Sequence, residues 1–185
     1  MSTAAVRAAV TGDATEIARI QRVTWRTAFA DLLGEQALAQ LEATAEHQWA
    51  EAIAHPATTV HVATEGTFTV GFCVAGPAPD DEVAAASGEL PADAARTGLI
   101  ATILVEPRWG RRGHGGRLLA EAAAGLRQNG AERGITWVAE SDSASLSFFR
   151  RAGWHPDGTV RTLDTGQRRL REVRLTGQLE IELVG

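Results

Sequence analysis

The sequence contains one cysteine, Cys73, and no lysine or tyrosine among its 185 residues. A single cysteine excludes an internal disulfide framework and a cysteine-based metal cluster. Because Cys73 sits in the strand-like run TVGFCVAG, we expect it to be a small buried apolar side chain rather than a nucleophile. The five histidines show no paired spacing typical of metal ligands, so no metal site is predicted.

Long apolar runs are also missing. No segment approaches the roughly 20 residues that cross a membrane, and the first residues have neither a long apolar core nor the layout of a signal peptide. We therefore expect a cytoplasmic protein without a membrane partner. The formal net charge of −5 disfavours nonspecific binding to nucleic acid and mildly favours cationic substrates.

The composition that remains is that of a globular protein, with 44% hydrophobic and 22% charged residues. A chain of this length buries about two-thirds of its unfolded surface when it folds as one unit. No internal repeat or linker divides the sequence. We therefore predict a single domain over residues 1–185.

The stretch from Leu99 to Leu126 predicts a strand, a turn rich in glycine and arginine, and a helix. Its glycines remove side chains that would keep an anion from the backbone; they are Gly110, Gly113, Gly115 and Gly116. The first turn of a helix offers unpaired N–H groups and the positive end of the helix dipole. This turn is therefore predicted to bind a phosphate or pyrophosphate.

Two common phosphate-binding devices do not fit this turn. A P-loop needs a lysine after its last glycine, but Arg117 follows Gly116. A dinucleotide fingerprint that starts at Gly113 needs a third glycine where Leu118 stands. Both alternatives are therefore excluded.

The other segments predict alternating strands and helices. Asp13, with Glu16 three residues later, predicts a capping box. The run GPAPDDEVAAASGELPADAART predicts a surface loop. The alternative interpretation is that this loop covers the entrance to a substrate site. Asn129-Gly130 predicts a helix stop, and Ser141 or Asp142 predicts a helix cap. Further strands are expected at Thr3–Val10, Thr58–Thr64, Thr67–Ala75, Ile135–Ala139 and as a pair within Thr159–Leu179 around a Thr165–Gln167 turn, and further helices at Asp13–Ala30, at Glu35–Ala54 with an interruption near Thr44, and before Gly153. This order, β-α-α-β-β-β-α-β-α-β-β, predicts a mixed sheet with helices on both faces.

Two motifs resemble signatures of the GNAT superfamily of acetyl-CoA-dependent N-acetyltransferases. The run P-x-W-G-R-R-G-H-G-G-R-L-L from Pro107 to Leu119 resembles its Q/R-x-x-G-x-G/A motif, with Gly110 in place of the leading residue. The tract ESDSASLSFFRRAGW resembles its second signature, N-x-x-A-x-x-F-Y-x-x-x-G-F. The matching positions there are Asp142, Ser145, Phe148, Phe149, Gly153 and Trp154.

The resemblance implies an α/β (α+β) fold whose central sheet is splayed, with acetyl-CoA as the acyl donor. The pantetheine arm would lie between the central strand and the next one and pair with backbone near Ile103, Leu104 and Val105. The N–H groups of Arg111, Arg112, Gly113, His114, Gly115 and Gly116 would hold the pyrophosphate, with Asp142, Ser145, Phe148 and Phe149 lying nearby. The His114 side chain is expected to point outward, and a branched side chain at Gly115 to block the anion.

Acetyl transfer to an amine requires a neutral nucleophile, and a free alkyl amine has a pKa of about 10.4. Glu140 at a strand end is the first candidate for the base, and Glu106 is the second. A backbone N–H near Leu104 or Val105 is expected to stabilise the oxyanion. The usual proton-donating tyrosine is replaced by Phe149, which leaves Ser145, one helical turn earlier, or a water as the acid.

The acceptor is not identified by the sequence. The family resemblance places the first two helices and their junction near the substrate, so Trp25, Phe29 and Asp31 are candidate pocket residues. Antibiotics, polyamines, amino acids and peptide N-termini remain open as acceptors, and a homodimer remains open as an assembly. The alternative to an N-acetyltransferase is a catalytically weak acyl-CoA-binding or regulatory module.

Overall fold

The computed structural model describes residues 3–164, 166 and 169–182, with side chains described for all of these except residues 28–34 and 37. Within these described residues, seven strands and four α-helices follow one another. They are β1 (Ala4–Ala8), α1 (Ala14–Ala54), β2 (Thr59–Glu65), β3 (Phe68–Pro77), α2 (Asp80–Val83), β4 (Thr97–Val105), α3 (His114–Gln128), β5 (Arg133–Ala139), α4 (Ser143–Arg151), β6 (His155–Asp164) and β7 (Arg169–Gln178).

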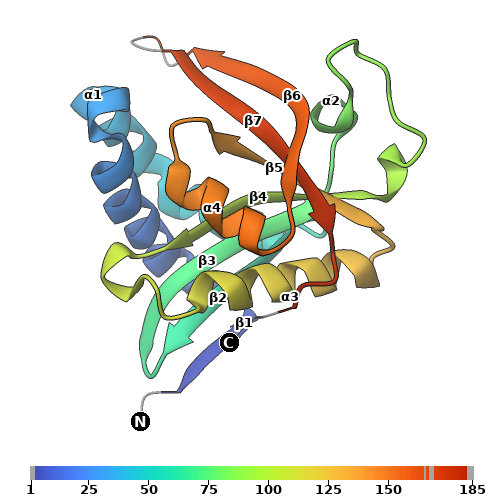
Figure 1. The fold of residues 1–185 in the computed structure, drawn as a ribbon. Helices are drawn as coiled ribbons and strands as arrows, with labels where there is room; N and C mark the ends of the chain where they lie inside the picture. Colours follow the sequence, from blue (N-terminus) through green and yellow to red (C-terminus); the bar gives the residue numbers. More distant parts are fainter. Residues whose placement is uncertain (1–2, 165, 167–168, 183–185) are drawn as a thin grey trace.

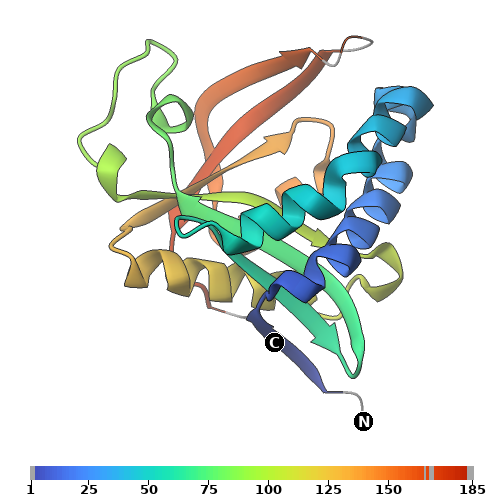
Figure 2. The same ribbon diagram turned by 180° about the vertical axis from the view of Figure 1, so that it is seen from behind.

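The strands form one sheet in the order β1-β2-β3-β4-β5-β7-β6. Neighbouring strands are antiparallel except β4 and β5, which are parallel. Helices α3 and α4 lie in front of the sheet in Figure 1, and α1 lies on the opposite face in Figure 2. The predicted mixed sheet with helices on both faces is therefore confirmed.

Each face of the sheet carries its own apolar core. On one face, Leu118, Leu119 and Ala122 of α3 pack with Phe149 of α4. Because these α3 residues recur at helical spacing, one stripe of the helix is buried against the strands. On the other face, Ile17 and Ile20 of α1 pack against Val60, Val62 and Phe72 of β2 and β3.

The central strands β4 and β5 separate soon after they meet. Their ladder joins only Thr97–Leu99 to Arg133–Ile135, although β4 continues to Val105 and β5 to Ala139. At the end of the ladder the hydroxyl of Thr136 donates a hydrogen bond to the carbonyl of Ile100, at 2.8 Å. The expected splay of the central sheet is confirmed, and it leaves a gap between the two strands.

Helix α1 differs from the two separate helices that were predicted, because helical structure continues from Ala14 to Ala54 without a break near Thr44. The chain nevertheless doubles back, since Arg26 binds Glu42 and Trp49 donates to Gln21. Figure 2 shows the two arms of this helix.

The predicted capping box at the start of α1 is wrong. The carboxylate of Asp13 makes no hydrogen bond that caps α1; it accepts from Arg7 and from the backbone N–H of Val10, which caps the 3-10 turn at Thr11–Asp13 instead. Glu16 instead accepts from Arg19. The guanidinium of Arg7 and the N–H of Val10 therefore engage the side chain that was expected to cap the helix.

The segment between β3 and β4 is more ordered than the predicted surface loop. It contains α2 and a 3-10 turn at Ala94–Arg96, and Val83 is buried. The closing strand pair is confirmed as β6 and β7, with β6 beginning earlier, at His155. Within the predicted turn between them, Thr165 and Gln167 lie outside the described residues.

Candidate functional site

The edge of β4 that faces the gap is set by the pairing of this strand with β3. The N–H of Glu106 donates to the carbonyl of Val70 at 2.9 Å, and Leu104 is the direct partner of Phe72. Because backbone groups alternate in direction along an antiparallel pair, Leu104 bonds toward β3 while Ile103 and Val105 face the gap. Two of the three predicted residues can therefore pair with an extended ligand there.

The turn after β4 presents a row of backbone donors. It passes through a 3-10 turn at Pro107–Trp109, and both Arg111 and Gly113 have left-handed backbone conformations, with φ of 64° and 80°. None of the N–H groups from Arg111 to Gly116 donates to an acceptor among the described residues. Such a run of free donors at a helix start is a site for an anion.

The prediction that the His114 side chain points outward is wrong, because His114 is only 1% exposed. Its Nε2 lies 2.8 Å from Oε2 of Glu65, at the end of β2. Arg112 donates to the other oxygen of the same carboxylate at 3.0 Å. The hydrogen bond from His114, helped by the charge of Arg112, holds the pKa of Glu65 below its ordinary value. Glu65 thus links the turn at Arg111–Gly116 to the β2–β3 hairpin.

Gly115 brings three of the predicted site segments together. A Cβ atom at this position would lie 3.3 Å from the ring of Phe148 in α4 and 3.9 Å from Cγ2 of Val105 in β4. A side chain at Gly115 would therefore point into this packed junction, which differs from the expected obstruction of the anion. Glycine is needed here because α3 and α4 approach each other closely.

Helix α4 is capped as predicted by Asp142, whose Oδ1 accepts from the N–H of Ser145 at 3.0 Å. The hydroxyl of Ser145 donates to Oδ2 of the same carboxylate at 2.6 Å. Phe149 is buried and packs on Trp154, with ring centroids 5.6 Å apart. The position that commonly carries a tyrosine therefore contributes to the core.

The two candidate bases differ in their surroundings. Glu140 is exposed at the end of β5, and one of its oxygens lies 3.3 Å from Nε of Arg171. Glu106 is buried, and its two oxygens bind Arg19 at 3.0 Å and Arg108 at 2.6 Å. Both oxygens of Glu106 are occupied by guanidinium groups, whereas Glu140 contacts one arginine and is exposed, so Glu140 is the more accessible carboxylate.

The predicted acceptor residues lie on α1. Trp25 lines a small space between the two arms of this helix, facing Gln21, Leu38 and Ala45. The side chains of Phe29 and Asp31 lie outside the described part of the structure. Their predicted contact with a substrate stays a prediction.

A cavity of about 140 Å³ opens where β4 and β5 diverge, and sequence reasoning did not find it. Its residues come from the β3–β4 segment and from four strands, so no contiguous motif marks them. The alternating charges in REVRL are typical of an exposed strand and gave no such signal. The lining residues are Glu82, Leu99, Ile100, Ala101, Trp137, Arg161 and Glu172.

Within residues 3–164, 166 and 169–182, no helix combines the length and the apolar character needed to span a bilayer. The same residues contain no group of three or more histidine, cysteine or acidic side chains placed to hold a metal ion.

The described residues thus form a mixed α/β domain in which an open strand edge lies beside a row of free backbone donors. A sequence model of the acetyltransferase (GNAT) family matches residues 17–154, and the chain belongs to this family. No curated relative matches the sequence.

Solved structures of the same fold include several N-acetyltransferases. The PaiA N-acetyltransferase from Thermoplasma acidophilum, in complex with coenzyme A, has a TM-score of 0.73 and 14% identity over 95% of this chain and 99% of that one. The ribosomal-protein-alanine N-acetyltransferase from Brucella melitensis has a TM-score of 0.70 and 19% identity, covering 94% and 99%. YncA from Salmonella typhimurium, a putative acetyltransferase with acetyl-CoA, has a TM-score of 0.69 and 17% identity, covering 100% and 98%.

Proposed function

We propose that this protein transfers an acetyl group from acetyl-CoA to a primary amine by direct attack within a ternary complex. The observation that carries the proposal is the row of free N–H groups from Arg111 to Gly116, next to the open edge of β4. An anion on the row and an extended arm along Ile103 and Val105 fit a ligand that joins a pyrophosphate to a pantetheine chain. Acetyl-CoA supplies the acyl group as a thioester.

The backbone of β4 supplies the electrostatic part of the proposed reaction. The N–H groups of Ile103 and Val105 face the gap and are the donors available to a carbonyl oxygen that gains negative charge. Since the N–H of Leu104 is directed toward β3, Val105 is the stronger of the two earlier candidates. Such a donor contributes about 10² to 10³ in rate in other enzymes.

Proton transfer is assigned to Glu140 and Ser145. Glu140 would accept the proton that the amine loses as the carbon–nitrogen bond forms and the carbon–sulfur bond breaks. The Ser145 hydroxyl donates to Asp142 in this structure, so it would turn toward the departing sulfur and pass on its proton as it takes another from water. Because a thiol has a pKa of about 8.5, its thiolate can also leave without an acid.

The second candidate function is a catalytically weak acyl-CoA-binding or regulatory module. The observation that favours it is Phe149, which offers no proton, in a sequence without tyrosine. Loss of general acid assistance typically lowers a rate by about 10² to 10⁴. The same donor site would then serve binding rather than turnover.

Two measurements test these functions. Calorimetric titration should detect acetyl-CoA binding at submillimolar concentration, and its absence would reject both functions. A panel of amines, followed by release of free CoA, separates them: release that depends on the amine supports transfer, and binding without release supports the module.

Variants with matched controls test the assigned residues. Glu140→Gln should shift the pH–rate profile, whereas Glu132→Gln, at the other end of β5 and also paired with an arginine, should not. Ser145→Ala should lower turnover more than donor affinity, with Ser147→Ala on the exposed side of α4 as control. An unchanged profile or turnover would remove Glu140 or Ser145 from its assigned role.

A further inference from the structure

The 140 Å³ cavity lies at the closed end of the gap, on the sheet face opposite α3. Leu99 and Ala101 of its lining belong to the part of β4 where the ladder to β5 ends. Leu99 pairs with Gly76 on β3, two residues after Val74, which packs against the core under α1. Strand residues two apart share a face, so Leu99 opens toward the α1 side.

This position lies further along the path of the proposed donor, beyond the part of β4 where Val105 and Ile103 face the gap. A ligand with its phosphates at Arg111–Gly116 and its arm along Val105 and Ile103 runs back along β4 toward Leu99, where the strands rejoin. At about 3.3 Å per residue, the cavity lies a few residues beyond Ile103 along that path. The cavity is therefore placed to receive an acceptor from the opposite face.

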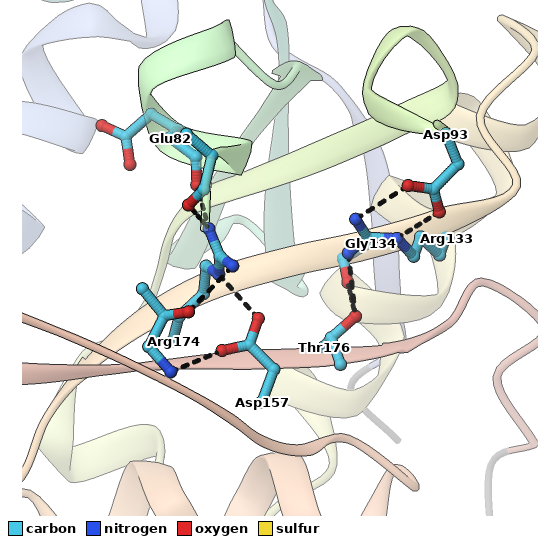
Figure 3. A network of polar contacts seen from close by, with 9 residues as sticks. Glu82, Asp93, Arg133, Gly134, Asp157, Arg174 and Thr176 are labelled. Carbon is cyan, nitrogen blue, oxygen red and sulfur yellow. Dashed lines mark hydrogen bonds and ion pairs between the residues drawn. The ribbon is translucent and has the colours of Figure 1, made fainter. Parts of the chain in front are cut away.

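One wall of the cavity is the segment between β3 and β4. Hydrogen bonds from Arg174 of β7 fix the backbone of this segment. Arg174 is 6% exposed, and its guanidinium donates to the backbone carbonyls of Glu82 and Ala84, each at 2.9 Å. It also binds Asp157 at 2.6 Å. Figure 3 shows this anchor and a second one, in which Arg133 binds Asp93. The segment is thus fixed over the β5–β7–β6 half of the sheet.

The charged lining of the cavity carries an excess of negative charge. Arg161 donates to Glu82 at 2.9 Å and to Glu172 at 2.6 Å, so one guanidinium serves two carboxylates. Its Cζ atom lies 4.2 Å from the ring centre of Trp137, which fixes it against the sheet. Arg174 and Asp157 neutralise each other nearby. The lining therefore has a net charge of about −1, which a ligand with one positive charge would neutralise.

We propose that this cavity is the acceptor site, that Glu82 is its specificity-determining residue, and that the acceptor is a primary amine of net positive charge without a carboxylate. The inference rests on the proposed function and narrows its substrate class. An amino acid, whose carboxylate cancels its ammonium charge, gains less from the lining than a simple alkyl amine does. Arg174 acts as a positioning residue, because it holds the backbone on which Glu82 stands.

Two small amines test this inference without relying on turnover. Butylamine and 4-aminobutanoate share a four-carbon chain and an ammonium group, and they differ in the carboxylate. Their dissociation constants are measured by calorimetry on the protein saturated with CoA. We expect butylamine to bind about tenfold more tightly, as for one charge opposite a partly exposed carboxylate.

The variant Glu82→Gln keeps the backbone carbonyl that Arg174 binds and removes the excess negative charge, so the preference for butylamine should fall to about twofold or less. The control is Glu89→Gln, the same change at an exposed position of the same segment, and it should keep the wild-type preference. Equal affinities in the wild type, or an unchanged preference in Glu82→Gln, would overturn the inference.

Turnover separates this inference from the proposed function. If the preference behaves as expected but neither amine releases CoA from acetyl-CoA, the cation site stands and acetyl transfer to these amines is rejected. If CoA is released equally well with both amines, transfer stands and the assignment of Glu82 is wrong.

Discussion

Replacing Gly113 with alanine tests the proposal that the turn before α3 binds the phosphates of the donor. Gly113 precedes α3 with φ 80° and ψ 2°, a left-handed conformation that strains any residue with a Cβ atom. The added Cβ would meet only the guanidinium of Arg117, at 3.4 Å, which is ordinary contact with the end of a flexible side chain. The effect of Gly113→Ala is therefore conformational rather than a clash.

The magnitude follows from the backbone alone. Holding an alanine in the left-handed region costs about 1–2 kcal/mol. If the free protein keeps the turn, its free energy of unfolding falls by that amount and donor affinity is unchanged. If the turn of the free protein instead takes another conformation, the free energy of unfolding is unchanged and acetyl-CoA binding weakens by about 5- to 30-fold. The loss of unfolding free energy and the loss of binding free energy should therefore sum to about 1–2 kcal/mol.

Calorimetry with acetyl-CoA and chemical denaturation measure the two losses separately. The control is Gly125→Ala within α3, where an added Cβ meets no atom within 4 Å. It should raise the free energy of unfolding by about 0.5–1 kcal/mol and leave binding unchanged. A Gly113→Ala protein with unaltered stability and unaltered affinity would refute the assignment of this turn as the site of the phosphates.

Three further changes probe other parts of the molecule. A hydrogen bond from Arg133 lowers the pKa of Asp93, so Asp93 contributes stability above its unfolded pKa of about 3.9 and loses it as the pH falls through the lower folded value. The difference in unfolding free energy between wild type and Asp93→Asn should therefore shrink between pH 5 and pH 2, and a constant difference would reject this linkage. Burial raises the pKa of the Cys73 thiol to about 12, so a disulfide reagent at pH 8 should label it only after unfolding. Gly177→Ala would place a Cβ in clash with the indole ring of Trp154 and should lower the unfolding free energy, measured by denaturant titration, by about 3 kcal/mol.

Local patterns predicted the centre of the fold well. The run from Leu99 to Val105, the glycines after it and the apolar stripe of α3 follow from residue type and spacing alone. Asp142 was one of two predicted caps, and the structure selects it. These features depend on neighbours within a few residues, which is why a single sequence reveals them.

Errors arose where a partner outside the local pattern decides which contact a side chain makes. His114 stands between glycines and was expected to be exposed, but its ring is buried and pairs with the carboxylate of Glu65, which is far away in sequence. Asp13 is placed to cap α1, yet Arg7 takes its carboxylate. The cavity combines Glu82, Trp137 and residues of other strands whose register a single sequence does not encode.

The short ladder between β4 and β5 leaves the sheet incomplete at its centre, with only Thr97–Leu99 joined to Arg133–Ile135. A donor molecule lying along Ile103 and Val105 would act as the missing strand, so its binding free energy would also be folding free energy. At one hundred times its dissociation constant, such a ligand stabilises a folded chain by about 2.7 kcal/mol. The supply of donor around the protein would then govern how long the chain survives unfolding and proteolysis as well as how fast it works.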